Sequence, residues 1–466
     1  MNIVIGNAWP YSNSKLHLGR IAVLLPGDVI ARYHRMMGDN VIFISGSDAH
    51  GRLVLEKALE EGLSPKETNT KYHKEFSRCF KALNFSFDLF TSTETDYHKE
   101  KVKEFIKELY DKGYIYEKVA FERETNKESN HLFFKLSNFE NDIKRIFIKR
   151  QMFRENAEEI TKRYLEEGLR DRAVTKEIDW GVEVPIGGFS DKRIFVWIEA
   201  VMGYLTATMK VLEDSNEDLY DYWDDEDSKI YLVHGKDNIP FHTIIFPGIL
   251  AALGIKNPNL SIVSSNHLKL EGKPFSGVKN WAVWVDYITS KYNVDSIRYY
   301  LLLNGPEDSD TDFKWRNFIS LNNFDLVSEL DNLYKDTIKC VNLDSYKRTL
   351  SKEDKNKILN LYFSIGEKIE EGSFRASLKE LFSYIKERNK SRAKSIDELI
   401  NIANILEVFL PDTAKKIKDT FKIKESVWNI INSVEIKEIL DYKPLFIPID
   451  RNNASYEFLR LKEKRK

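Results

Sequence analysis

Polar side chains follow two apolar runs near the start of the chain, where parallel strands of an α/β sheet would end. Ile3-Val4-Ile5 leads into Trp9-Pro10-Tyr11, and Val41-Ile42-Phe43-Ile44 leads into Ser47-Asp48-Ala49-His50. Between these runs, His17-Leu18-Gly19-Arg20 opens a long amphipathic segment. A helix that begins there presents free N–H groups and the positive end of its dipole, which attract phosphates. Because open α/β sheets bind ligands at the carboxyl ends of their strands, we predict a small-molecule site here.

Further apolar runs place these residues in a sheet built from two halves of the chain. Residues 194–197, 230–233 and 260–264 are apolar, and we expect them to be further strands of the same sheet. One helix is predicted over about 53–61 and a second from about residue 64. A third helix is predicted to end at Lys112-Gly113. The highly charged residues 116–190, with a helix over 157–168, then form an insertion between the two halves.

From about residue 321 almost to the end of the chain, apolar residues recur with the 3.6-residue period of helices. Helices are predicted near 321–342, 352–371, 374–389, 395–409 and 411–421, followed by a frayed basic tail over 460–466. The expected organisation is a first half-domain (1–115), an insertion (116–190), a second half-domain (191–265), a stem region (266–325) and an all-helical domain (326–466).

The net charge, the hydropathy pattern and the cysteine count indicate the compartment in which the protein works. The 466 residues carry a net charge of −2 and a sequence pI of about 6.6, so the chain has no overall basic bias. It has no apolar run long enough for a membrane span and no evident signal peptide. The two cysteines, Cys79 and Cys340, are too few for a disulfide framework. We therefore expect a cytoplasmic protein that makes no contact with a membrane.

Several motifs occur together in one order along the chain. They are Trp9-Pro10-Tyr11, His17-Leu18-Gly19-Arg20, residues 43–51, residues 195–204, residues 235–242 and Lys443-Pro444-Leu445-Phe446. Together they resemble the methionyl-tRNA synthetases, a subgroup of the class I aminoacyl-tRNA synthetases. The resemblance implies an α/β fold: a Rossmann-like parallel sheet split by an insertion, followed by an all-α helical bundle. It also implies methionine and ATP as substrates, Mg²⁺ as cofactor, and tRNA as the usual partner.

The resemblance also implies which residues bind the substrates. The family's methionine pocket matches Trp9, Tyr11, Asp48, Trp197, Ala200, Tyr204, Asn238, His242 and Phe246. Aromatic rings suit a soft thioether, and Asp48 would pair with the substrate ammonium group. Glu199 stands where many members have aspartate. The ATP side would be lined by His17, Gly19, Lys236, Asp237 and Ser276.

One departure from the family pattern concerns the loop whose two lysines hold the ATP phosphates. Here it reads Lys273-Pro274-Phe275-Ser276-Gly277-Val278-Lys279, with Pro274 and Gly277 at the two lysine positions. Losing such a charge typically costs on the order of 10²–10³ in rate. We expect His17, Arg20, Lys273 and Lys279 to act as the catalytic residues, with the displaced lysines and Arg20 partly compensating.

Two further departures lie where members of the family contact tRNA. The insertion has no cysteine, so the family's zinc knuckle cannot form, and we expect no zinc and no other metal-ligating residues. Asn332 of the anticodon motif is kept, but the arginine position is Asp336 and the Pro-Trp pair is Lys390-Ser391. An acidic residue repels nucleic acid, and the lost tryptophan removes a stacking platform. The nearest tryptophan in the sequence is Trp428.

The sequence therefore leaves three functions open. The first is an ordinary methionine–tRNA ligase. The second, which the altered tRNA features favour, is a paralogue that activates methionine or a close analogue but has another acceptor or reads tRNA differently. The third is a non-catalytic binding or regulatory protein that senses methionine. Since the chain ends at the helical domain, without the dimerisation module of some relatives, we expect a monomer.

Overall fold

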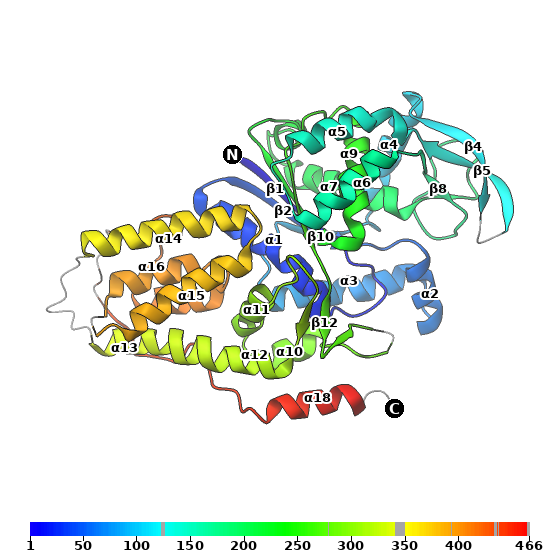
Figure 1. Ribbon diagram of the computed structural model, residues 1–466. Coiled ribbons are helices and arrows are strands. Elements are labelled where there is room, and N and C mark those ends of the chain that lie inside the picture. Colours follow the sequence, from blue (N-terminus) through cyan, green and yellow to red (C-terminus); the bar gives the residue numbers. More distant parts are fainter. Residues whose placement is uncertain are drawn as a thin grey trace. The chain divides into compact units, whose positions relative to one another are not determined.

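The computed structural model describes residues 1–122, 126–277, 279–340, 350–392, 394–432, 436 and 438–463 (Figure 1). The expected helix over 321–342 ends outside these residues, and so does the tail beyond residue 463. The chain forms two compact units. The sheet unit comprises residues 1–16, 40–79 and 87–265, and the helical unit comprises residues 17–39, 80–86 and 266–466.

A six-stranded parallel sheet organises the sheet unit. Its order is β3 (Leu89–Ser92), β2 (Asn40–Ser47), β1 (Asn2–Asn7), β10 (Lys229–Gly235), β11 (Leu260–Ser265) and β6 (Met152–Phe153). Ile5 pairs with Phe43 on one side and with Tyr231 on the other. Strands from the two halves of the chain therefore meet at β1 and β10, where the strand order reverses and a crevice for ligands is expected. The predicted split parallel sheet is confirmed.

Helices cover this sheet and carry much of its core. They are α2 (Arg52–Glu61), α3 (Pro65–Ala82), α4 (Asp96–Asp111), α7 (Val196–Leu212), α8 (Leu219–Trp223) and α9 (Phe246–Leu253), with a π-helical turn η3 (Phe241–Ile245) before α9. Val4, Ile42, Val102 and Met202 belong to one buried cluster between these elements. The sequence prediction was wrong at residues 194–197. Only Arg193–Ile194 is extended (β9), and the apolar run continues as α7, because a buried helix and a buried strand share this composition.

The insertion builds its own small layers. A hairpin of β4 (Ile115–Glu122) and β5 (Lys127–Phe134) pairs with β7 (Arg172–Ala173), and β8 (Thr175–Lys176) pairs with β9. Between them lie η1 (Leu136–Phe139), α5 (Glu140–Lys149) and α6 (Glu155–Glu167). No sequence pattern indicated β6, which joins the edge of the main sheet from inside the insertion.

The helical unit begins with α1 (Leu18–Met37), the helix that follows His17. Its other helices are α10 (Val285–Lys291), α11 (Val294–Leu303), α12 (Trp315–Leu321), η4 (Asn322–Asp331), α13 (Asn332–Cys340), α14 (Lys352–Glu370), α15 (Phe374–Lys390), α16 (Ile396–Leu406), α17 (Pro411–Thr420) and α18 (Asn453–Glu463). A small sheet of β13 (Lys273–Pro274), β12 (Leu268–Leu270) and β14 (Thr311–Phe313) carries the loop of the stem region.

A fully buried ion pair ties α1 to α11. Arg298 donates to Asp28 at 2.7 Å, to the carbonyl oxygen of Phe409 at 2.8 Å and to that of Leu83 at 3.0 Å. Burial alone would raise the pKa of Asp28, but the guanidinium groups of Arg32 and Arg298 lower it to about 2. These contacts join the middle of α1 to α11 and to the segments around Leu83 and Phe409 within the helical unit.

Candidate functional site

A cavity of about 50 Å³ lies at the crevice of the sheet unit. We call it the inner cavity, and its lining residues are Ala8, Trp9, Tyr11, Asp48, Trp197, Ala200, Val201, Tyr204, Asn238, Phe241 and His242. Eight of the nine residues that the sequence assigned to a methionine pocket are brought together here. Phe246 is not among the lining residues. It is fully buried behind Tyr204, with 5.7 Å between their ring centroids.

Strand ends and one face of α7 position this lining. The loop after β1 is anchored to Asp48, which donates its backbone N–H to Pro10 O at 2.9 Å, while Ser12 donates to Asp48 O at 2.9 Å. Residues 197, 200 and 204 are three and four positions apart, so they lie on one face of α7. Phe241 was not identified from the sequence. It stacks on Trp197 with 4.0 Å between ring centroids and completes the aromatic wall.

Two glycines let Trp9 lie flat against the cavity. A Cβ atom at Gly46 would come within 2.6 Å of the Trp9 ring, and one at Gly203 would come within 3.0 Å. Contacts this short do not occur between real atoms, so any larger residue at Gly46 would displace the indole. The indole Nε1 is buried and has no hydrogen-bond partner among the described residues.

Two of the lining residues, His242 and Tyr204, form a polar but uncharged pair. His242 Nδ1 lies 2.8 Å from the carbonyl oxygen of Asn238, and Nε2 lies 2.9 Å from the Tyr204 hydroxyl. Burial lowers the pKa of His242 to about 4, so the ring is neutral at physiological pH. With its Nδ1 proton donated to the carbonyl, Nε2 accepts from Tyr204. This pair therefore suits an apolar or thioether chain better than a charged group.

The lining also contains a buried carboxyl group, Asp48, which is 3% exposed. Burial and the negative charge of Glu199 raise its pKa well above the ordinary value, and the charge of His50 only partly opposes this. The residues that line the cavity, all of them described, include no lysine or arginine. A buried carboxyl in this setting favours a ligand that brings its own cation.

A second pair of charges beside Asp48 was not expected from the sequence. His50 Nδ1 lies 2.6 Å from Glu199, and Nε2 lies 2.9 Å from Glu94. Burial alone would lower the pKa of His50, but these carboxylates raise it to about 10. Burial would raise the pKa of Glu199, but the imidazolium lowers it to about 2. A glutamate inside the apolar run of α7 was the one available signal. Glu199 is thus paired internally, which leaves Asp48 for a ligand.

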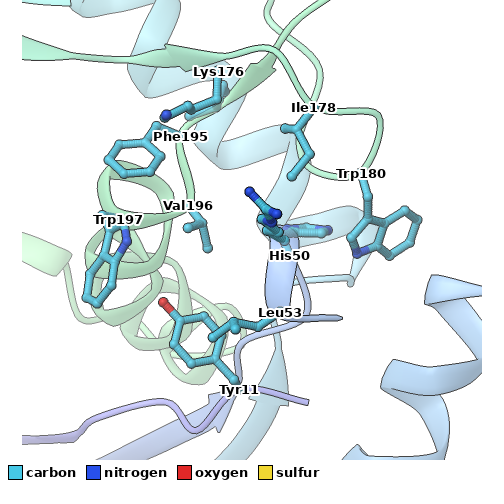
Figure 2. Close-up of a pocket in the computed structure, with 12 residues that line it drawn as sticks. Tyr11, His50, Leu53, Lys176, Ile178, Trp180, Phe195, Val196 and Trp197 are labelled. Carbon is cyan, nitrogen blue, oxygen red and sulfur yellow. The ribbon is translucent and has the colours of Figure 1, made fainter. Parts of the chain in front are cut away.

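A larger cavity of about 330 Å³ lies next to the first, and we call it the outer cavity (Figure 2). Its lining residues are Tyr11, His50, Gly51, Arg52, Leu53, Lys176, Ile178, Trp180, Ile194, Phe195, Val196 and Trp197. Tyr11 and Trp197 line both cavities. The walls come from the loop after β2, from the start of α7 and from the β8–β9 part of the insertion.

In the helical unit, the start of α1 is packed against the stem loop. The His17 ring stacks on Phe275 with 4.9 Å between ring centroids. A Cβ at Gly19 would come within about 3.0–3.1 Å of both rings, so glycine is needed for this stack. Burial and the charge of Arg20 lower the pKa of His17 to about 3, so the ring is neutral. The His17 Nδ1 atom is buried and has no hydrogen-bond partner among the described residues.

The two displaced lysines of the stem loop differ in their surroundings. The Lys273 ammonium lies over the Trp281 ring, 5.2 Å from its centroid, while the Lys279 side chain is exposed. The Ser276 hydroxyl accepts the backbone N–H of Lys279 at 3.2 Å, which tightens the turn. In the sheet unit, Lys236 and Asp237 follow β10 in a short 3₁₀ turn, η2 (Lys236–Asn238).

The positions that match the family's anticodon motif lie in neighbouring segments of the helical unit. Asn332 and Asn389 both donate to the carbonyl oxygen of Ser328, at 2.9 and 3.2 Å. The Lys390-Ser391 pair therefore adjoins the start of α13, which carries the half-buried Asp336. Trp428 is packed at 5.5 Å from the Tyr362 ring and donates to the Tyr362 carbonyl, so it serves the core.

Comparisons with known proteins agree with this arrangement. The sequence profile of the family "tRNA synthetases class I (M)" matches residues 3–123 and 119–338. The chain is 38% identical to methionine–tRNA ligase 1 of Alkaliphilus oremlandii, over 99% of this chain and 100% of that protein. It is 36% identical to the methionine–tRNA ligase of Bacillus mycoides, over 99% of each. The first alignment spans 539 positions, 73 more than the 466 residues of this chain, so the relative contains segments without a counterpart here.

Solved structures show the same fold. The crystal structure of Mycobacterium tuberculosis methionyl-tRNA synthetase bound by methionyl-adenylate matches with a TM-score of 0.83 and 21% identity, over 96% of this chain and 100% of that chain. Among the described residues, no helix is long and apolar enough to cross a membrane.

Proposed function

Because the chain belongs to the class I methionyl-tRNA synthetase family, we propose that it activates methionine with ATP and transfers it to tRNA. By its family it is an aminoacyl-tRNA ligase. Relatives named as methionine–tRNA ligases, aligned over almost the whole chain, support the ordinary ligase better than the paralogue that the sequence alone favoured. The observation that carries the proposal is the lining of the inner cavity, which combines a buried carboxyl group with aromatic rings and a neutral Tyr204–His242 pair.

In the proposed complex, methionine lies in the inner cavity in one orientation, set by Asp48 and by the Tyr204–His242 pair. Its ammonium group would pair with Asp48, which is buried and has its pKa raised. Its thioether chain would lie among Trp9, Trp197 and Phe241 and reach the neutral Tyr204–His242 pair. The α-carboxylate would then lie at the Asp48 end of the cavity, where it can be presented to ATP.

Activation requires alignment more than acid–base chemistry. One carboxylate oxygen of methionine attacks the α-phosphorus of ATP, the bond from that phosphorus to the bridging oxygen breaks, and pyrophosphate leaves with the electron pair. Holding the two groups in line and stabilising the developing charge supply most of the rate. Neutral His17 can donate a hydrogen bond to a phosphate oxygen, Gly19 leaves room for the nucleotide, and Arg20 adds positive charge.

The remaining ATP contacts follow the sequence assignment. We assign them to Lys236, Asp237 and Ser276. Of the two displaced lysines, we assign the phosphate contact to Lys279, which is exposed, because Lys273 is held over the Trp281 ring. The described residues include no group of three or more His, Cys, Asp and Glu that could hold a metal ion. Mg²⁺, which neutralises phosphate charge, would therefore be carried mainly by the phosphates of ATP.

One observation favours a second candidate, a methionine-activating enzyme with altered recognition of its acceptor. Asp336 and the Lys390-Ser391 pair stand beside Asn332, where the family has an arginine and a tryptophan. A carboxylate at a nucleic-acid surface is repulsive and Ser391 offers no stacking ring. In this candidate the inner cavity and the activation step are unchanged.

Two linked measurements test the proposal. Exchange of labelled pyrophosphate into ATP is measured with each of the twenty amino acids, and only methionine should support it. Charging of unfractionated tRNA with labelled methionine is measured next and should occupy the methionine-accepting fraction. Absence of exchange would refute activation, and exchange without charging would favour the second candidate.

A further inference from the structure

Within the sheet unit, two histidine rings lie against each other behind the inner cavity. His234, near the end of β10, stacks on His242 of η3, with 4.0 Å between the ring centroids and 18° between the ring planes. His242 lines the inner cavity, whereas His234 is not among the lining residues, all of which are described. The His234 side chain is fully buried. The proposed activation step gives it no role.

A histidine at this position costs stability. The His234 Nε2 atom is buried and has no hydrogen-bond partner among the described residues. Burial, with smaller contributions from His242 and Arg154, lowers the pKa of His234 well below its ordinary value, so the ring is neutral. A buried acceptor that lacks a donor is unfavourable for folding. Leu232 is equally buried on the same face of β10, so an apolar side chain would fill this face without that cost. The contacts of the ring, rather than its burial, therefore account for a histidine here.

The two rings hold the turn η2 from both ends. His234 Nδ1 lies 3.0 Å from the carbonyl oxygen of Gly235, the residue directly before η2. His242 Nδ1 lies 2.8 Å from the carbonyl oxygen of Asn238, the last residue of η2. A neutral imidazole has one N–H group, and an Nδ1 this close to a carbonyl oxygen carries it and donates. The two residues of η2 that we assign to ATP lie between these carbonyl groups. The stack therefore joins the wall of the inner cavity to the turn that carries two of the ATP contacts.

We propose that His234 is a positioning residue for both substrates of the activation step: its ring holds His242 at the methionine site, and the two rings together hold η2 at the ATP site. The proposal rests on the proposed function. Without the stack, the His242 ring is free to turn away from the Tyr204 hydroxyl, which lies 2.9 Å from its Nε2. Without the Nδ1 donor of His234, the beginning of η2 loses an anchor. Because a displacement of about 1 Å can cost on the order of 10²-fold in rate, a residue that touches neither substrate can still set their geometry.

The test separates the ring of His234 from its hydrogen bond. His234→Leu removes both, whereas His234→Phe keeps a ring for the stack but has no N–H donor. His73→Leu is the matched control, because His73 of α3 stacks on Phe90 in the same unit, with 5.2 Å between ring centroids, and lines neither cavity. Isothermal titration calorimetry of the full chain gives the Kd of ATP and the Kd of methionine, each ligand alone. Methionine-dependent ATP–pyrophosphate exchange is measured in parallel, and urea unfolding verifies that each variant folds.

His234→Leu should raise the Kd of ATP about tenfold and that of methionine about fivefold, since a ring stack and a hydrogen bond each contribute a factor of roughly 2–10. His234→Phe should bring the Kd of methionine to within about twofold of wild type and leave ATP binding weakened about threefold, because only the hydrogen bond is lost. His73→Leu should change neither Kd. A purely structural role of His234 would lower the stability of its variants without this separation of the two ligands.

The proposal is overturned if His234→Leu binds both ligands as wild type does, if His234→Phe binds methionine no better than His234→Leu, or if His73→Leu weakens both ligands to the same degree. Should His234→Leu not fold, His234→Phe decides alone: intact methionine binding with weakened ATP binding supports the role, and two unchanged Kd values overturn it. Wild type that binds both ligands without exchange would overturn the proposed function instead, while the Kd values still decide the role of His234.

Discussion

Replacing Asp48 with asparagine should weaken methionine binding and stabilise the empty protein at the same time. The carboxyl is 3% exposed, its pKa is raised by burial and by Glu199, and its one described hydrogen bond comes from the backbone N–H of His50 at 3.3 Å. Such a group is retained at a cost to stability, which is common where function requires a strained site. Asparagine has the same shape without the charge.

The magnitudes follow from the contacts that are lost. A hydrogen bond between charged groups contributes about 1.5–3 kcal/mol, so Asp48→Asn should raise the Kd of methionine roughly 10–150-fold. Relief of the buried charge should raise the free energy of unfolding by about 1–2 kcal/mol. Isothermal titration calorimetry and urea unfolding measure the two quantities, and Asp179→Asn, at an exposed position, is the control.

The pH dependence gives the prediction its sign. In the unfolded chain Asp48 ionises near its ordinary pKa of about 3.9, whereas in the folded protein it keeps its proton to a higher pH. The folded state is therefore penalised increasingly as pH rises from the first value towards the second, and the excess stability of Asp48→Asn should grow over that interval. Methionine should bind wild type more tightly as pH rises through the same interval. A variant that is less stable than wild type yet binds methionine equally well would refute this reasoning.

Three further variants test other parts of the structure. Tyr204→Phe should lower the free energy of unfolding by about 1–3 kcal/mol, because the buried His242 Nε2 loses its donor; unchanged urea unfolding would show that the bond contributes nothing. Arg298→Met should destabilise the protein by about 3–5 kcal/mol, because Asp28 keeps only Arg32 as an arginine partner and the carbonyl oxygens of Phe409 and Leu83 lose their donor. Adding Asp28→Asn should restore part of the loss, and a double variant no more stable than the single one would contradict the pairing. Lys279→Ala should slow methionine-dependent exchange about tenfold or more if this lysine serves the phosphates, and an unchanged rate would exclude that role.

The sequence predicted the sheet and most of the inner cavity because both depend on short stretches. Trp9 and Tyr11 follow β1 directly, Asp48 follows β2, and the motif around Trp197 and Tyr204 lies on one helix face. Local structure alone places each of these residues at a strand end or on one helix face, so the position predicted from the motif is the position found in the fold. The helices between residues 321 and 421 were predicted from their 3.6-residue period, whereas α10, α11 and α18 were not predicted.

What the sequence missed depends on contacts between distant residues. His50 and Glu199 are 149 positions apart and meet only in the folded chain. Phe241 lines the cavity through its stacking on Trp197, whereas Phe246 is buried against Tyr204, and both contacts join η3 and α9 to the distant helix α7. The tail expected to be frayed from residue 460 onward is still helical to residue 463, since Glu457 of α18 accepts a hydrogen bond from Tyr287 at 2.7 Å. None of these pairings has a periodic signal.

A crystal structure of the protein soaked with methionine tests the central claim most directly. The account predicts methionine in the inner cavity, with its ammonium nitrogen at hydrogen-bond distance, about 2.7–3.2 Å, from an Asp48 carboxylate oxygen and its sulfur among Trp9, Phe241 and Tyr204. Methionine in the reverse orientation, in the outer cavity, or absent from both at saturating concentration would contradict it.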